Sequence, residues 1–186
     1  IAPRAAVGGN AASVFYLNTS NALNTITAAP STNWCEAFGV YNVVSDGNLI
    51  HYNTALSSLT WPAGNDVRMP RASGKCQAIF SLSDDQALLV WSRGMAYLSG
   101  QDPDVFAIHE LVNLPFENVG NAICRVGDRV ALMGPGTKLY LYNPSLQRFD
   151  APVENALEDL PDTDQCQMWY DHVDNTICLS GVGVGA

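Results

Sequence analysis

Apolar residues occur along this chain in short runs of strand length, separated by clusters of polar, turn-forming residues. Runs of Val, Leu, Ile, Tyr and Phe are interrupted by Gly, Pro, Asn, Asp and Ser roughly every 8 to 12 residues. Segments with the 3.6-residue period of an amphipathic helix are sparse. The pattern predicts an all-β protein.

The stretch from Arg129 to Asp150 shows how these runs connect. "RVALMG" and "KLYLYN" are predicted strands, and "PGT" between them is a turn. "NPSLQR" turns the chain again, and "RFDAP" can form a short edge strand. Consecutive strands joined by such short turns pair antiparallel, so this stretch is predicted to be part of a β meander.

The same sequence pattern recurs along the chain: an apolar strand, a glycine turn, then a strand that ends in polar or small residues. A repeat with a period of 20 to 50 residues indicates a repeat architecture, so this observation precedes any choice of fold. The first internal copy also has a further predicted strand that ends at Trp61. The four copies turn at Gly9, Gly47, Gly94 and Gly136 and reach Leu17–Thr19, Tyr52–Thr54, Leu98–Gly100 and Tyr142–Pro144.

Each internal copy is preceded by a further apolar strand that carries a cysteine. These cysteines are Cys35, Cys76 and Cys124, and Cys166 supplies the fourth near the other end of the chain. They recur at intervals of roughly 40 to 50 residues, the length of a four-stranded propeller blade. The first copy lacks this strand, so we expect strands from both chain ends to complete the fourth blade.

These repeats resemble the blades of β-propellers, with a rhythm similar to kelch and quinoprotein-type repeats and to fungal fucose-lectin blades. The resemblance implies a small four-bladed propeller formed by one domain, residues 1–186. A β-sandwich or jelly roll, which also has many short strands, is the alternative. The expected blades are 35–61, 76–111, 122–151, and 166–186 together with 10–28.

The charge balance limits the partners to consider. The chain has 18 acidic residues against nine basic ones, a net charge of −9. Binding to nucleic acid depends on neutralising phosphates with Lys and Arg, so neither nucleic acid nor an anionic membrane is an expected partner. No stretch has the pattern of a membrane span or a signal peptide, so an exported protein would have lost its leader.

The five cysteines lack the close pairs of a zinc site, and no metal or cofactor is expected. In an oxidising compartment they could form at most two disulfides, and fifteen pairing patterns remain open. The favoured interpretation is that these cysteines are buried, because free cysteine is among the most buried residue types.

No catalytic constellation is evident. The three histidines, His51, His109 and His172, fall in different strands of their repeats, so fourfold geometry would not bring them together. An enzyme with a pocket on the propeller axis is nevertheless kept as an alternative, with His109, Glu110 or Asp85 as its acid/base candidates.

The connection from Thr60 to Lys75 concentrates aromatic and ionisable side chains in a chain that has few bases. An aromatic ring can cover the apolar face of a sugar or peptide, while Arg and carboxylate groups fix its polar atoms. The alternative is that the tryptophans cap blade ends as packing residues. The predicted ligand-binding residues are Trp61, Asp66, Arg68 and Arg71 in this connection, with Trp34 and Arg93 in loops of neighbouring repeats.

We interpret the chain as a secreted or cell-surface binding module that recognises a carbohydrate or other small ligand in a lectin-like manner. The enzyme described above is one alternative. The other is a structural or interaction protein within a larger assembly, with a protein partner or a homo-oligomer as its binding mode.

Overall fold

The computed structural model describes residues 14–17, 23–26, 34–46, 49–55, 60–68, 76–113, 122–134, 138–150 and 167–180. Within these ranges the chain is all β apart from one short 3-10 helix, η1 (Pro103–Val105). No helix in the described ranges is long and apolar enough to cross a membrane. The all-β prediction is confirmed.

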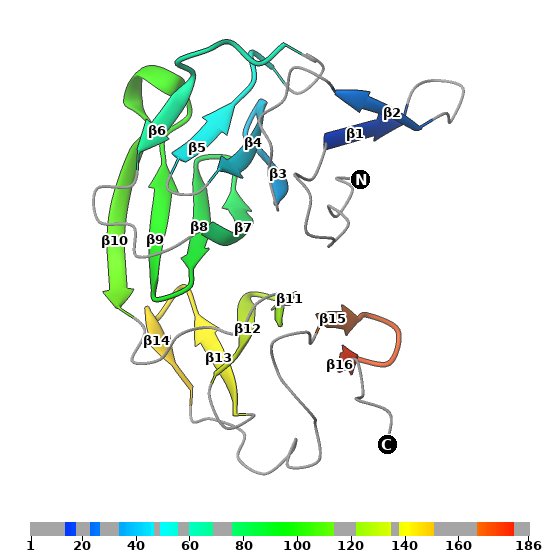
Figure 1. The fold of residues 1–186 in the computed structure, drawn as a ribbon. Helices are drawn as coiled ribbons and strands as arrows, with labels where there is room; N and C mark the ends of the chain where they lie inside the picture. Colours follow the sequence, from blue (N-terminus) through cyan, green and yellow to red (C-terminus); the bar gives the residue numbers. More distant parts are fainter. Residues whose placement is uncertain are drawn as a thin grey trace. The chain divides into compact units, whose positions relative to one another are not determined.

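Three four-stranded antiparallel sheets form the larger part of the fold (Figure 1). In every one of them each strand pairs with the next strand in the sequence, which is the predicted meander. The first sheet contains β3 (Cys35–Phe38), β4 (Tyr41–Asp46), β5 (Leu49–Tyr52) and β6 (Asp66–Arg68). The second contains β7 (Cys76–Ser83), β8 (Gln86–Trp91), β9 (Gly94–Ser99) and β10 (Ala107–Asn113). The third contains β11 (Ile123–Val126), β12 (Arg129–Met133), β13 (Leu139–Asn143) and β14 (Arg148–Phe149).

Two hairpins lie towards the ends of the chain. One consists of β1 (Val14–Leu17) and β2 (Leu23–Ile26), the other of β15 (Gln167–Asp171) and β16 (Thr176–Ser180). The chain divides into two compact units, Ile1–Val112 and Asn113–Ala186, and each hairpin belongs to a different unit. The four-blade count, the blade boundaries and the closing blade therefore stay predictions.

The first strand of each four-stranded sheet contains one of the repeating cysteines, as predicted. Cys35 and Cys76 begin β3 and β7, and Cys124 is the second residue of β11. Cys76 and Cys124 are buried, as the packing interpretation expects, and Cys35 and Cys178 are partly exposed. No disulfide joins any of these four described cysteines, so the disulfides considered above find no support among them, and Cys166 lies outside the described residues.

The last strand of the first sheet differs from the prediction. The strand expected to end at Trp61 does not extend to that residue, because Thr60–Pro62 are not in a strand and a turn follows at Ala63–Gly64; residues 56–59 lie outside the described residues. The fourth strand is β6, which starts at Asp66. The error came from treating the segment after Trp61 as a loop only, although it contains the strand that completes the sheet.

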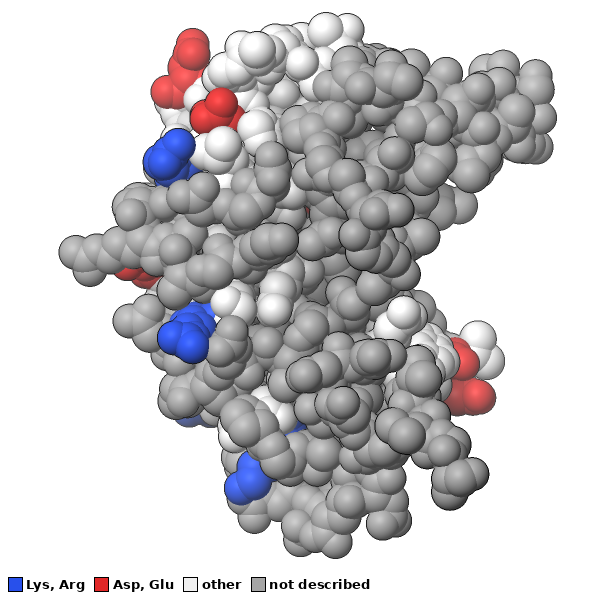
Figure 2. Space-filling view, viewed as in Figure 1, with Lys and Arg blue, Asp and Glu red and all other residues white. Residues whose placement is uncertain are grey.

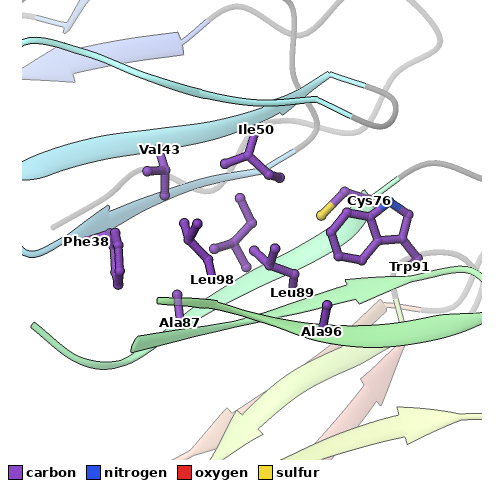
Figure 3. Packing of buried hydrophobic residues seen from close by; sticks show 10 residues of the cluster. Phe38, Val43, Ile50, Cys76, Ala87, Leu89, Trp91, Ala96 and Leu98 are labelled. Carbon is purple, nitrogen blue, oxygen red and sulfur yellow. The ribbon is translucent and has the colours of Figure 1, made fainter. Parts of the chain in front are cut away.

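The first two sheets pack against each other through apolar side chains (Figure 3). Side chains of the first sheet, including Phe38 and Ile50, meet those of the second, including Ile79 and Leu89, and all four are almost completely buried. Full burial of such a side chain contributes about 1.5–3 kcal/mol. Across the same interface the Ser81 backbone N–H donates a hydrogen bond of 3.4 Å to Glu36 Oε1. Two sheets packed face to face in this way provide the core of the first unit.

The second unit has a core of its own, built from the third sheet and the β15–β16 hairpin. Buried Cys124, Ala131 and Met133 of the sheet pack with Met168 of the hairpin. Partly buried Tyr170 and Ile177 extend this cluster. In each unit, neighbouring β segments therefore bury their apolar faces against each other.

Candidate interaction surface

The strand registers define two ends of the first sheet. At one end lie the β3–β4 turn and the connection from β5 to β6, because Phe38 pairs with Tyr41 and His51 pairs with Asp66. We call this the aromatic end. At the other end lie the β4–β5 turn and the residues that enter β3 and leave β6.

Three aromatic side chains meet at the aromatic end: Tyr41 from β4, Tyr52 from β5 and Phe106 from the β9–β10 connection. The ring centroids of Tyr41 and Tyr52 are 6.1 Å apart, those of Tyr41 and Phe106 5.7 Å, and those of Tyr52 and Phe106 5.3 Å. The interplanar angles are 76°, 85° and 85°, so the three rings are nearly perpendicular to one another. All three side chains are partly exposed, and Phe38 lies beneath them with its centroid 5.6 Å from that of Phe106.

Phe106 is held there by the compact β9–β10 connection. Gly100 starts the connection at φ +121°, and a Cβ on it would lie 2.7 Å from the Val105 carbonyl oxygen, so the close turn requires glycine. The Gly100 N–H donates to the Asp85 carbonyl oxygen at 3.0 Å. Pro103, whose φ suits the first helical position, begins η1, and the N–H of Phe106 donates to the Pro103 carbonyl oxygen at 3.3 Å.

Carboxylates lie near the aromatic rings, Asp66 at the start of β6 and Asp102 and Asp104 in the β9–β10 connection. Partial desolvation, followed by the charges of Asp102 and Asp104, raises the pKa of the Tyr41 phenol above its ordinary value. Desolvation together with Asp104, Asp66 and Tyr41 raises the pKa of the Tyr52 phenol in the same way. Both shifts show that these carboxylates lie close enough for their charges to be felt at the rings.

Two exposed valines adjoin the rings in sequence. Val40 in the β3–β4 turn is 59% exposed and Val105 in η1 is 61% exposed. Asp84 and Asp85 in the neighbouring β7–β8 turn are exposed as well, and the backbone of Asp84 approaches Gly39. The aromatic end therefore presents apolar, aromatic and acidic groups together.

Charge in the first unit is unevenly distributed. Among its described residues only Arg68 and Arg93 are basic, and the registers place both away from the aromatic end of their sheets. Arg68 pairs with Leu49 at the opposite end of the first sheet, and Arg93 lies in the β8–β9 turn. In Figure 2 acidic side chains lie at the upper left, over the region where Figure 1 draws β6 and the β9–β10 connection, and a basic side chain lies directly below them.

The six predicted ligand-binding residues do not gather at one end. Trp61 and Asp66 belong to the aromatic end, whereas Trp34 and Arg68 belong to the opposite end of the same sheet. Arg93 is exposed in a turn of the second sheet, and Arg71 lies outside the described residues. Trp34 packs on the core with its ring centroid 5.4 Å from that of Phe80, which is the packing role considered as the alternative.

The acid/base candidates form no catalytic arrangement among the described residues. His109 Nε2 lies 3.0 Å from Ser99 Oγ, and the Ser99 hydroxyl donates to the Ala107 carbonyl oxygen at 3.4 Å. Asp85 accepts a hydrogen bond of 2.6 Å from Ser83 Oγ in an exposed turn. No group of three His, Cys, Asp or Glu side chains able to hold a metal ion occurs in the described ranges.

Solved structures provide the comparison that decides the architecture. The chain is similar to the β-propeller domain of Cps50 (Swd1) from Myceliophteria thermophila, with 10% identity and a TM-score of 0.57 over 94% of this chain and 64% of that one. The architecture is that of a β-propeller. The chain spans less than two thirds of the length of the Swd1 domain that it matches.

Two further structural neighbours are more distant. Kluyveromyces lactis Hsv2 has 12% identity and a TM-score of 0.43 over 94% of this chain and 68% of that one. A chain in a Saccharomyces cerevisiae assembly of Dbp5 with Nup159 and Gle1 has 9% identity and a TM-score of 0.49 over 72% of this chain and 35% of that one. No protein-family model matches the sequence. No curated protein matches it either.

The sequence analysis missed the residues that the propeller brings together at the aromatic end. Tyr52 was named only as the end of a predicted strand, and Tyr41 and Phe106 were not considered. A usable signal was present, because Tyr41, Tyr52 and Phe106 each stand beside a turn or at a strand boundary. Such positions place a side chain at the end of a sheet, where binding residues of rigid scaffolds gather.

Proposed function

We propose that this propeller is a protein-interaction module whose aromatic end contacts its partner. The observation that supports the proposal is the joint exposure of Val40, Val105 and the Tyr41–Tyr52–Phe106 cluster on one sheet end. Tyr and Phe are enriched in protein interfaces, where aromatic anchors supply much of the binding energy. A rim of carboxylates around an apolar centre is also the usual anatomy of such an interface.

The scaffold suits this role. The aromatic end is built on strands whose apolar faces are locked into the core between the first two sheets. A site on such strands is held more rigidly than one on long loops, so little conformational entropy is lost on binding. The proposal therefore requires no rearrangement of the sheet.

Carbohydrate recognition by a secreted lectin-like module is the second proposal, and it would use a different set of residues. It relies on Trp61, whose indole Nε1 is buried without a hydrogen-bond partner among the described residues. The other residues proposed for it are divided between the two ends of the first sheet and a turn of the second, as described above. We therefore favour a protein partner.

A display library of random peptides tests the proposal. We expect the protein to enrich peptides whose affinity falls about tenfold or more in the double variant Val40→Ser/Val105→Ser, because two apolar contacts are lost while the charge of the surface stays the same. Val173→Ser is the matched control, since Val173 is 91% exposed in the β15–β16 turn and should not affect binding.

Two outcomes would contradict the proposal. One is that no peptide is enriched, and the other is that the enriched peptides bind the double variant as well as the original chain. Binding on a glycan array that is lost in Trp61→Ala would instead support the carbohydrate proposal.

A further inference from the structure

The ring geometry at the aromatic end indicates more than a general apolar contact. Three rings that are nearly perpendicular form a corner, and their centroids lie between 5.3 and 6.1 Å apart. The face of an aromatic ring carries negative electrostatic potential and attracts cations within about 6 Å of the centroid. A corner of this kind offers a cation more than one ring.

The carboxylates favour the same type of ligand. Asp102 and Asp104 come from the β9–β10 connection and Asp66 from the start of β6, so two sheets contribute charge to one place. No Lys or Arg side chain in the described parts of the chain forms an ion pair with these three acids. Their negative charge is therefore available to an incoming cation.

We propose that the aromatic end binds a cationic side chain, lysine or arginine, of the partner protein, with Tyr41, Tyr52 and Phe106 contacting its alkyl stem and charged group. Asp66, Asp102 and Asp104 supply the charge complementarity. This inference rests on the proposed function, since it names the chemistry of the partner at that surface. An anionic or wholly apolar partner segment would not satisfy the same groups.

The contribution of the rings differs from that of the carboxylates. The rings attract the cation at short range and cover its alkyl stem, and this term depends little on salt. The carboxylates act over a longer distance and are screened, with a Debye length of about 8 Å at physiological ionic strength. Raising the salt concentration should weaken binding without abolishing it.

The test uses acetylated tripeptides that differ only in the central residue. Glycine flanks lysine, trimethyllysine, arginine or the neutral isostere norleucine, and binding is followed by NMR from the ring signals of Tyr41, Tyr52 and Phe106. We expect at least one cationic peptide to bind about threefold or more tightly than the norleucine peptide, the size of an exposed cation–π contact. The order among the three cationic peptides identifies the preferred group.

Variants separate the two contributions. Tyr52→Leu should lower the affinity of the cationic peptide about threefold while retaining apolar volume. Asp102→Asn/Asp104→Asn should lower it and reduce its salt dependence. Glu110→Gln removes an exposed carboxylate from β10 and should leave binding unchanged. Thermal melting of each variant shows whether it is folded.

Equal affinity for the lysine, trimethyllysine, arginine and norleucine peptides would overturn the inference. So would cation binding that persists unchanged in both the Tyr52 and the Asp102/Asp104 variants. These results leave the proposed function standing if the peptide library still yields ligands sensitive to Val40→Ser/Val105→Ser. A library without ligands contradicts the proposed function even where the tripeptides bind.

Discussion

A Cβ atom on Gly39 would lie 2.7 Å from the backbone carbonyl oxygen of Asp84. Gly39 is in the β3–β4 turn and Asp84 is in the β7–β8 turn, so the turns of two successive sheets touch at this point. Gly39 also has φ +56°, a conformation that side-chain-bearing residues rarely adopt. Glycine is therefore needed at position 39 for two reasons: the backbone conformation of the turn, and the close approach of two sheets beside the proposed binding surface.

Replacing Gly39 with alanine should destabilise the first unit by about 3 kcal/mol. Positive φ costs an alanine about 1–2 kcal/mol, and displacing a backbone carbonyl adds a similar amount. Equilibrium unfolding in urea measures the loss. The control is Gly64→Ala in the same unit, where φ is +91° and no atom lies within 4 Å of the added Cβ. Equal losses at the two positions would show that the contact with Asp84 is unimportant.

Stability should fall steeply in alkali because of Cys76. Burial raises the pKa of its thiol from 9.0 to about 12. The folded state therefore holds this proton more tightly, and the unfolded state loses it first. The stabilising contribution is complete below pH 9.0 and is lost as the pH rises towards 12.

The matching measurement compares the free energy of unfolding of the natural chain and of Cys76→Ala across this pH range. The natural chain should lose up to about 1.4 kcal/mol more per pH unit than the variant. Comparing slopes removes the effect of the lost sulfur atom on packing. Parallel slopes would mean that the thiol is not buried in solution.

Thiol labelling at pH 8 should rank the cysteines by accessibility. Cys76 is 2% exposed and Cys124 is 7% exposed, so both should react only through opening of the structure. Cys35 is partly exposed, but burial and the charge of Glu36 raise its pKa to about 11, which slows it. Cys178 should therefore react first among these four. Rapid labelling of Cys76, detected by mass spectrometry of peptides, would contradict the burial of this residue at the start of β7.

We expect the side chain of Asn53 to contribute strongly to the stability of the first unit. Its side chain is buried, accepts a hydrogen bond of 2.7 Å from the Asn42 N–H and donates one of 2.7 Å to the Ala55 carbonyl oxygen. Asn53→Ala leaves these backbone groups without that partner and should cost about 2–3 kcal/mol. Asn65→Ala, at a partly exposed position nearby, should cost less than about 1 kcal/mol. Thermal unfolding of the two variants makes the comparison.

The sheet pattern could be predicted from the sequence because it depends on local signals. Apolar runs and the cysteine repeat are short-range features, and they correctly indicated three meanders with a cysteine in each first strand. Of the glycines expected in turns, Gly94 is instead the first residue of β9, and Gly47 and Gly136 lie outside the described residues. The β6 strand was missed because three residues, Asp66–Arg68, are too few to show a period. Its place is fixed by pairing with β5, which the sequence does not display.

The candidate surface was much less predictable. Trp61 and Arg68 were chosen for their chemistry, yet their distance along the chain does not show that they lie towards different ends of one sheet. Phe106 reaches Tyr41 only because two sheets pack together and the β9–β10 connection is compact. Contacts between sheets depend on tertiary packing, so single-residue chemistry could not reveal this cluster.

The strictly sequential pairing of strands has a consequence for how the protein is made. In each four-stranded sheet every strand pairs with its neighbour in the sequence, so only short loops are closed and little chain entropy is lost at each step. A growing chain can complete one sheet before the next has left the ribosome, since synthesis adds about 5–20 residues per second. The first sheet, once finished, offers its apolar face as a template for the second, which gives folding of the first unit a direction along the chain.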